Sequence, residues 1–232
     1  MNIGCHVPIS RGVDKAPEIA AKWGCEAMQI FTHSPSGGPI AEISDETANN
    51  FKVGIKKYSI DFVPTIILSK DAAAYGIIQQ AWAQIGSKET DGSYVLRVPS
   101  PPFINLTTGK LRGIVNIIYL TDISCTECYD VSQHKKILVN SQSFAVKLEK
   151  EETYDISDAE GKELIRKYNI TQVPTVILSD EINAYPSIQV LKQFYSIEKD
   201  ESYVFRTVSV VGTYKDLINK KIVEFQQQSE EK

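Results

Sequence analysis

The sequence predicts an α/β protein made of two tandem βαβαββ units. Two observations predict this class: a long segment occurs twice, and short β-branched runs alternate with stretches of helical periodicity. A chain of 232 residues is long enough for two units that each bury a core. Hydrophobic residues make up 42% of it and its net charge is -4, which offers no basic excess for nucleic acid.

The repeated segment indicates a tandem duplication. Residues 57–69 (KYSIDFVPTIILS) recur as residues 167–179 (KYNITQVPTVILS), an offset of 110 residues. A second match follows further on, where SYVLR at 93–97 recurs as SYVFR at 202–206. Self-similarity at a fixed period indicates repeated structural units, so each copy is expected to fold in the same way.

A boundary between the units is expected before the apolar run that opens at Ile114. Gly109 and Gly113 are turn residues that precede this run. We therefore predict a first unit at 1–112, a second at 113–225 and a polar tail at 226–232.

In the second unit, runs of β-branched residues predict strands, and apolar residues at helical spacing, such as Leu164, Ile165 and Tyr168, predict helices. The elements predicted in chain order are strand 114–120, helix 125–138, strand 143–148, helix 158–168, strand 173–178, helix 185–194 and strand 202–208.

Cys125 and Cys128 form the only closely spaced pair among four cysteines. At the start of the predicted helix, Cys125 would gain a lowered pKa from the helix dipole and act as the nucleophile. Cys128, one turn further along and deeper, would resolve a mixed disulfide. Glu127 and the nearby Asp122 disfavour the thiolate, which predicts a reducing pair. There are two alternatives for this cysteine pair. It could be half of a zinc site with His134 as a third ligand, or it could be an inactive relic of a redox site.

A strand, a Cys-x-x-Cys pair and a Val-Pro-Thr segment, with Pro174 lying 49 residues after Cys125, resemble the thioredoxin superfamily. Two such units resemble the archaeal-type protein disulfide oxidoreductases over about residues 42–225. The resemblance implies thiol–disulfide exchange through Cys125 and Cys128, with no cofactor. It also implies a cis Pro174 facing the substrate, with Val173 before it, and Pro64 as the structural proline of the first unit. Protein thiols or disulfides, or a reductase, are the implied partners.

Two positions differ from the thioredoxin pattern. Ser124 stands where the family has a tryptophan before the first cysteine, and Tyr119 stands where it buries an aspartate six residues earlier. The family's proton relay is therefore not implied for this chain.

The N-terminal segment follows another pattern. Residues 3–16 (IGCHVPISRGVDKA) and 23–31 (WGCEAMQIF) resemble the opening of endonuclease IV, a zinc-dependent apurinic repair enzyme with a TIM barrel, over about residues 1–36. A barrel needs eight βα units and cannot close here, and no metal ligand is implied. The first unit is thus expected to be a thioredoxin-like sandwich whose N-terminal βαβ (1–40) is supplied by a TIM-barrel-like segment, which makes the chain a chimera.

The replacement of the N-terminal βαβ of a thioredoxin-like unit by a TIM-barrel-like segment predicts a strand pairing. Ile3–Val7 and Ala27–Phe31 should pair as parallel strands, in one sheet with Thr65–Leu68. Cys5 and Cys25 are predicted to be buried structural thiols, and His6 and His33 to be polar residues at strand ends. Asp14 is predicted to cap the start of a helix.

The favoured function is a cytoplasmic thiol–disulfide oxidoreductase. The alternatives are a noncatalytic thioredoxin-like peptide-binding protein and a remnant of a zinc-dependent DNA repair enzyme. No apolar stretch approaches the roughly 20 residues of a membrane span, and the start does not read as a secretory signal. The oligomeric state is left open by the sequence.

Overall fold

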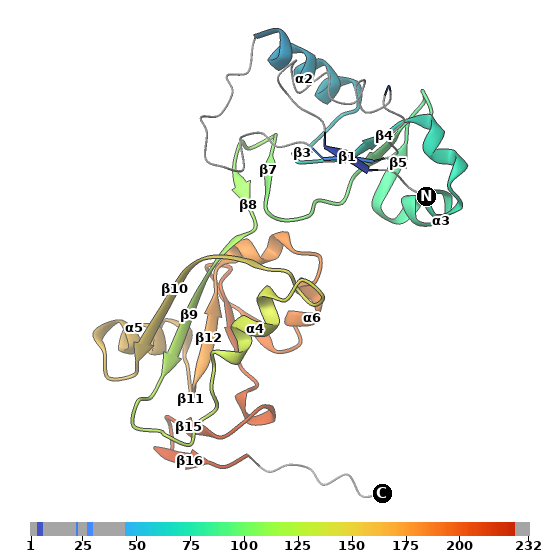
Figure 1. The fold of residues 1–232 in the computed structure, drawn as a ribbon. Coiled ribbons are helices and arrows are strands. Elements are labelled where there is room, and N and C mark those ends of the chain that lie inside the picture. Colours follow the sequence, from blue (N-terminus) through green and yellow to red (C-terminus); the bar gives the residue numbers. More distant parts are fainter. Residues whose placement is uncertain (1–3, 7–21, 23–26, 30–44, 226–232) are drawn as a thin grey trace, which may run out of the picture. The chain divides into compact units, whose positions relative to one another are not determined.

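The computed structural model describes residues 4–6, 22, 27–29 and 45–225 of a mixed α/β chain with several sheets (Figure 1). Contacts divide the chain into two compact units. One holds Met1–Asp61 and Thr65–Arg97, and the other holds Phe62–Pro64 and Val98–Lys232. This division falls at Arg97, before the boundary at 112 that the sequence predicts.

A five-stranded sheet forms the centre of the second unit, in the order β10-β9-β12-β14-β13. β9 and β10 are parallel and the other neighbours are antiparallel. The strands are β9 (Ile114–Thr121), β10 (Lys147–Asp155), β12 (Thr175–Leu178), β13 (Tyr195–Ile197) and β14 (Tyr203–Phe205). β9 lies inside the sheet because its apolar residues are buried on both faces.

Helices pack on both faces of this sheet. They are α4 (Gln133–Val139), α5 (Ala159–Tyr168) and α6 (Ile188–Leu191), with 3-10 turns η3 (Asp180–Ala184) and η4 (Val208–Val210). Asn169 caps the C-terminus of α5 and adopts the left-handed conformation at φ 49°. Gly161 lets this helix approach the sheet, since a Cβ there would clash with the Asp155 carbonyl oxygen.

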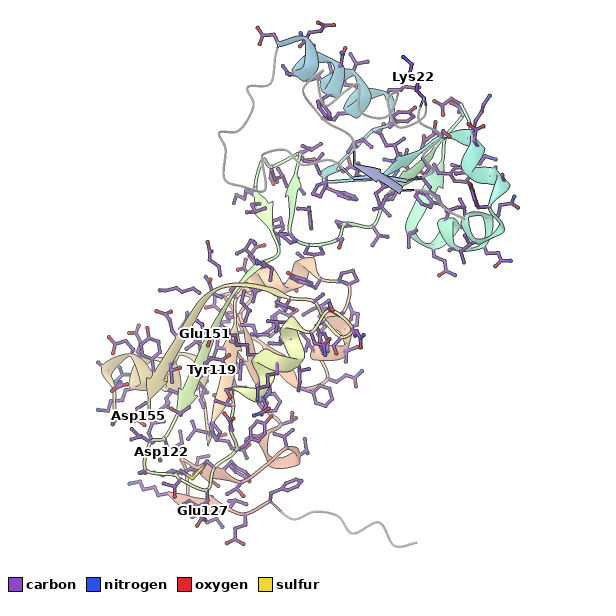
Figure 2. The ribbon with its side chains drawn as sticks, in the orientation of Figure 1. Lys22, Tyr119, Asp122, Glu127, Glu151 and Asp155 are labelled. Carbon is purple, nitrogen blue, oxygen red and sulfur yellow. A yellow bond between two sulfur atoms is a disulfide. The ribbon has the colours of Figure 1, made fainter. Side chains whose placement is uncertain are left out.

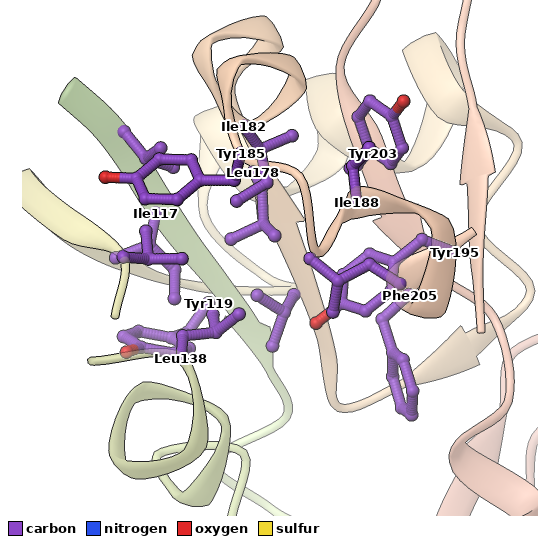
Figure 3. Packing of buried hydrophobic residues seen from close by; sticks show 14 of the residues in the cluster. Ile117, Tyr119, Leu138, Leu178, Ile182, Tyr185, Ile188, Tyr195, Tyr203 and Phe205 are labelled. Atoms are coloured by element: carbon purple, nitrogen blue, oxygen red, sulfur yellow. The ribbon is translucent and has the colours of Figure 1, made fainter. Parts of the chain in front are cut away.

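Two buried clusters follow the alternation of side chains along β9. Ile117 and Tyr119 point into a cluster with residues of α4 and α6, part of which Figure 3 shows. Leu120 belongs to the other cluster, which includes Tyr168 of α5. Every member of both clusters lies between residues 115 and 217.

Two small three-stranded sheets repeat one arrangement. In the second copy, β11 (Gln172–Val173) pairs with a hairpin of β15 (Tyr214–Asp216) and β16 (Lys221–Val223). In the first copy, β3 (Phe62–Val63) pairs with a hairpin of β7 (Phe103–Asn105) and β8 (Leu111–Arg112). The sequence analysis did not predict these hairpins.

The first unit contains short elements. β4 (Ile67–Leu68), β6 (Tyr94–Leu96) and β5 (Gly86–Lys88) form an antiparallel sheet, accompanied by α2 (Asp45–Lys57), η2 (Lys70–Ala74) and α3 (Gly76–Ile85). Trp82 of α3 is buried edge-on against Tyr94, and its indole N–H donates to the Ser87 carbonyl at 3.2 Å.

The predicted pairing near the N-terminus is confirmed in part. β1 (Gly4–His6) and β2 (Ala27–Gln29) are parallel. The prediction that they share a sheet with Thr65–Leu68 is wrong, because they form a two-stranded sheet of their own. β4 has only two residues, so its edge offers few backbone groups for another strand.

Polar contacts match between the two copies. Lys57 binds Asp91 at 2.7 Å, and Lys167 binds Asp200 at 2.6 Å. Arginine–glutamate pairs also recur at matching positions, as Arg97–Glu89 and Arg206–Glu198. The segments that share a sequence pattern thus also share their side-chain contacts.

Three predicted elements of the second unit are wrong in extent. Helix 125–138 begins only at Gln133, strand 143–148 is replaced by β10, and helix 185–194 shrinks to α6 and gives way to β13. The other predicted strands and helix 158–168 agree within a few residues. No helix among the described residues is long and apolar enough to cross a membrane.

Candidate redox site

Cys125 and Cys128 are joined by a disulfide in the loop that follows β9, with Cα atoms 5.4 Å apart. Figure 2 shows the yellow sulfur–sulfur bond near the labelled Asp122 and Glu127, at one end of the sheet. Cys125 is only 8% exposed, whereas Cys128 is half-buried. The predicted order of depth is therefore wrong, because Cys128 is the more accessible cysteine.

The cysteine pair does not sit at a helix N-terminus. α4 begins at Gln133, because the Tyr129 amide donates to the Thr213 carbonyl at 2.8 Å instead of continuing a helix from Cys125. The Asp130 carboxylate accepts from the Ser132 amide and so forms the turn that opens α4. The predicted effect of a helix dipole on the Cys125 thiolate therefore has no basis in this geometry.

Asp122 is a buried carboxylate three residues before Cys125. Its side chain, 4% exposed, forms an ion pair with the Lys215 ammonium and accepts from the Ser124 amide at 2.9 Å and hydroxyl at 2.6 Å. Burial alone would raise the pKa of Asp122, but these bonds outweigh it and hold the pKa below its ordinary value of 3.8. The Cys125 amide donates to the Asp122 carbonyl at 2.9 Å, which ties the carboxylate to the redox loop.

Lys215 is the site residue that the sequence analysis missed. It lies on β15, directly opposite Val173 of β11, and its side chain reaches Asp122. A comparison of the two copies of the repeat could have identified Lys215. Ile104 occupies the same place opposite Val63 in the copy without a Cys-x-x-Cys pair, so a cation replaces an apolar residue only beside the cysteines.

Val173 ends the short strand β11, which pairs with the strand of Lys215, and Pro174 follows it. Val173 is fully buried, the Val173–Pro174 peptide bond is cis, and the Val63–Pro64 bond of the first copy is cis as well. The backbone of Val173 pairs with β15, so Lys215 links this strand to the loop of Asp122 and Cys125. The roles of Val173, Pro174 and the two cysteines toward a substrate stay predictions.

The zinc alternative finds no support in the part of the chain that the structure describes. His134 is buried, its Nδ1 lies 3.0 Å from the Tyr195 hydroxyl, and burial lowers its pKa to about 4. No group of three or more histidine, cysteine, aspartate or glutamate side chains gathers among the described residues. His134 is a histidine of the core.

Several predicted residues fall elsewhere. Cys5 and His6 lie on β1. The predictions for Asp14, Cys25, His33 and the tail 226–232 lie outside the described residues.

Comparisons with known proteins give partial matches. No family model matches the chain. It is 43% identical over 61 residues to a "Probable endonuclease 4" of Cenarchaeum symbiosum, which is 26% of this chain and 22% of that protein. It is 39% identical over 127 residues to a "Probable endonuclease 4" of Thermotoga maritima, which is 51% of this chain and 44% of that protein.

Among solved structures, a thioredoxin from Thermus thermophilus is 17% identical, with a TM-score of 0.21. The likeness covers 35% of this chain and 71% of that one, and a score this low supports no argument about the fold. The chain spans less than half the length of the two endonuclease 4 proteins. The comparisons therefore show similarity over part of the chain to endonuclease 4 and only a weak likeness to a thioredoxin.

Proposed function

We propose that this protein is a cytoplasmic thiol–disulfide oxidoreductase that exchanges disulfides through Cys125 and Cys128. The observation that carries the proposal is the disulfide-bonded cysteine pair, of which Cys128 is partly exposed, in a loop held by the Asp122–Lys215 ion pair. Thiols or disulfides of other molecules, or a reductase, are the proposed partners. Val173 and Pro174 are proposed to lie on the substrate side of the pair.

The exchange proceeds in two displacements. A substrate thiolate attacks one sulfur of the Cys125–Cys128 disulfide, which forms a mixed disulfide and releases the other cysteine as a thiolate. A second substrate thiolate then attacks the mixed disulfide and releases the oxidised substrate. In this direction two substrate thiols lose two electrons, and the cysteine pair accepts them with two protons. The same steps in reverse reduce a substrate disulfide and oxidise the pair, which is the direction that a reducing pair favours. The accessibility of Cys128 makes its sulfur the expected point of attack.

Thiol counting in a variant that lacks Cys5 and Cys25 tests this proposal, because only the pair then remains. The oxidised protein should show no free thiol and should show two after equilibration with reduced dithiothreitol. Cys125→Ser and Cys128→Ser should each abolish catalysed exchange. Exchange that persists in both variants, or a pair that never oxidises, would contradict the proposal. The second result would favour a noncatalytic binding protein.

A redox titration tests the proposed reducing character. Glu127 places a negative charge between the two cysteines, whereas Asp122 is paired with Lys215, so on account of Glu127 we expect a potential closer to the thioredoxin value of about -270 mV than to the strongly oxidising value of about -120 mV. A measured value at the oxidising end would overturn this part of the proposal.

A second candidate rests on the partial match to endonuclease 4. Under it, the protein would retain metal-dependent cleavage of DNA at abasic sites. Incubation with an abasic duplex and added Zn²⁺ tests it, with an intact duplex as the control. Cleavage confined to the abasic duplex, lost on chelation, would support this candidate over disulfide exchange.

A further inference from the structure

The hairpin of β15 and β16 touches each of the three segments that build the redox site. The Lys215 side chain binds Asp122 before the cysteines, the Thr213 carbonyl accepts from the Tyr129 amide after them, and Lys215 pairs with Val173. Figure 1 places β15 and β16 beside β11, as the pairing requires.

The register shows which backbone groups the hairpin occupies. The Leu217 amide donates to the Thr171 carbonyl at 2.8 Å, so these opposite residues form a hydrogen-bonded pair. Antiparallel strands alternate hydrogen-bonded and non-bonded pairs. Counting two residues along, Val173 and Lys215 again form a hydrogen-bonded pair. The N–H and C=O of Val173 therefore both face β15.

The hairpin is anchored at several points outside the ladder. The Asp122–Lys215 ion pair is largely buried on the Asp122 side, and Leu217 packs against the core cluster that contains Val173. Gly212, at the entry to the hairpin, lies so close to Tyr129 that a Cβ there would come within 2.7 Å of the Tyr129 Cβ.

The copy without a Cys-x-x-Cys pair keeps the same hairpin. Val63 pairs with Ile104 as Val173 pairs with Lys215, and the Asn105 amide donates to the Lys110 carbonyl across the turn. Asn105 thus bonds β8, and by alternation Ile104 bonds Val63. Since the hairpin is present where there is no Cys-x-x-Cys pair to control, it is a constant part of the repeat and not a lid specific to the redox site.

Resting on the proposed exchange activity, we infer that the site takes low-molecular-weight thiols and disulfides and offers extended peptides no strand pairing, so it does not favour the protein partners that the resemblance implies. A peptide that adds a strand to a sheet needs free N–H and C=O groups at the sheet edge. Those of Val173 are taken by the chain's own β15. A small thiol needs no such pairing, and Cys128 is the more exposed of the two cysteines. Two small thiols are oxidised to one disulfide as the cysteine pair gains two electrons and two protons.

Reduction of the oxidised wild-type protein by two probes tests this inference. The probes are 2-mercaptoethanol and a capped six-residue peptide with one central cysteine. Each rate is divided by the rate of the same thiol with cystamine, which corrects for intrinsic reactivity. We expect the corrected peptide rate to be no higher than that of 2-mercaptoethanol, because a peptide that cannot pair with Val173 gains nothing from its backbone. A corrected peptide rate about tenfold higher, the value of two backbone hydrogen bonds, would overturn the inference, while no reduction by either probe would instead overturn the proposed function.

Opening the hairpin supplies the second test. Lys215→Pro removes both the amide that bonds Val173 and the ammonium that binds Asp122, so Lys215→Met, which loses only the ammonium, is its matched control. The corrected peptide rate of Lys215→Pro should exceed that of Lys215→Met by about tenfold, while both variants should react with 2-mercaptoethanol at the same rate. Ile104→Pro makes the backbone change in the other copy and should leave both rates at their wild-type values. A folded Lys215→Pro protein with the same corrected peptide rate as Lys215→Met would overturn the inference. The wild-type comparison decides it even if this variant does not fold.

Discussion

At the scale of single residues, the Asp122–Lys215 pair is the charged contact closest in sequence to the cysteines. Sequence reasoning noted Asp122 only as a nearby negative charge, because its partner comes from a strand 93 residues later. Long-range pairs of this kind leave no local pattern. Their existence follows from the fold, since a buried carboxylate needs a partner.

The lowered pKa of Asp122 predicts acid sensitivity. A carboxyl with a folded pKa below its unfolded value stabilises the protein above the ordinary value, and this contribution is lost as pH falls through the folded pKa. As the pH falls below the ordinary pKa of an aspartate, Asp122→Asn should therefore lose less stability than the wild type. At pH 7 the variant should be less stable by about 1–3 kcal/mol.

Urea unfolding at pH 7 and pH 3 measures this effect. Asp61→Asn, at an exposed position, is the control and should follow the wild type at both pH values. A variant at Asp122 with an unchanged acid profile would show that the ion pair contributes nothing to this sensitivity.

Two buried tyrosines of the core give a matched pair of variants. The Tyr195 hydroxyl lies 3.0 Å from His134 Nδ1, whereas the Tyr119 hydroxyl has no hydrogen-bond partner among the described residues. Tyr195→Phe should cost about 1–2 kcal/mol because it leaves a buried histidine nitrogen unpaired, while Tyr119→Phe should change stability by less than about 0.5 kcal/mol. Chemical denaturation measures both, and equal costs would refute the assignment.

At the scale of elements, the long and periodic segments were predictable. β9, α5 and β12 carry their apolar residues at the spacing of their final structure, and burial confirms the pattern. The start of α4 was not predictable, because it depends on the distant Thr213 carbonyl that holds the Tyr129 amide. The two- and three-residue strands of the hairpins are too short for periodicity to reveal, and only their repetition in both copies marks them.

Alanine substitutions at two helix glycines, Gly161 and Gly54, should have opposite effects on stability because the two positions have different surroundings. Gly161→Ala should destabilise the protein by about 2 kcal/mol or more, because the new methyl group would meet the Asp155 carbonyl oxygen and force α5 from the sheet. Gly54→Ala in α2 meets nothing within 4 Å and should stabilise that helix by about 0.5–1 kcal/mol. Thermal unfolding followed by circular dichroism measures both, and a destabilised Gly54→Ala protein would contradict the argument.

At the scale of the whole molecule, the two copies differ in the size of the sheet that surrounds the repeated strand. β12 of the second copy lies between two strands, and Val176 and Ile177 are buried. β4 of the first copy pairs only with β6 within the described ranges, and Ile66 and Ile67 are 52% and 43% exposed. The duplication was visible in the sequence, but this difference depends on which strands the preceding segment supplies.

The second copy should fold alone. Both of its core clusters draw only on residues 115–217, so a fragment of residues 113–225 keeps its entire core. We expect this fragment to unfold cooperatively and to react with dithiothreitol as the full chain does. Its circular dichroism, urea unfolding and thiol count test this. A fragment that lacks a cooperative transition would show that the N-terminal half is needed for folding.

The exposed side chains of Ile66 and Ile67 also bear on the solubility of the protein. Apolar side chains that stay exposed beside a strand promote association with another chain. Solutions of the full chain should therefore become turbid on concentration and clear again with mild denaturant. The fragment of residues 113–225, which lacks these two isoleucines, should stay clear at the same concentration, so the choice of boundaries decides how concentrated a sample can be made.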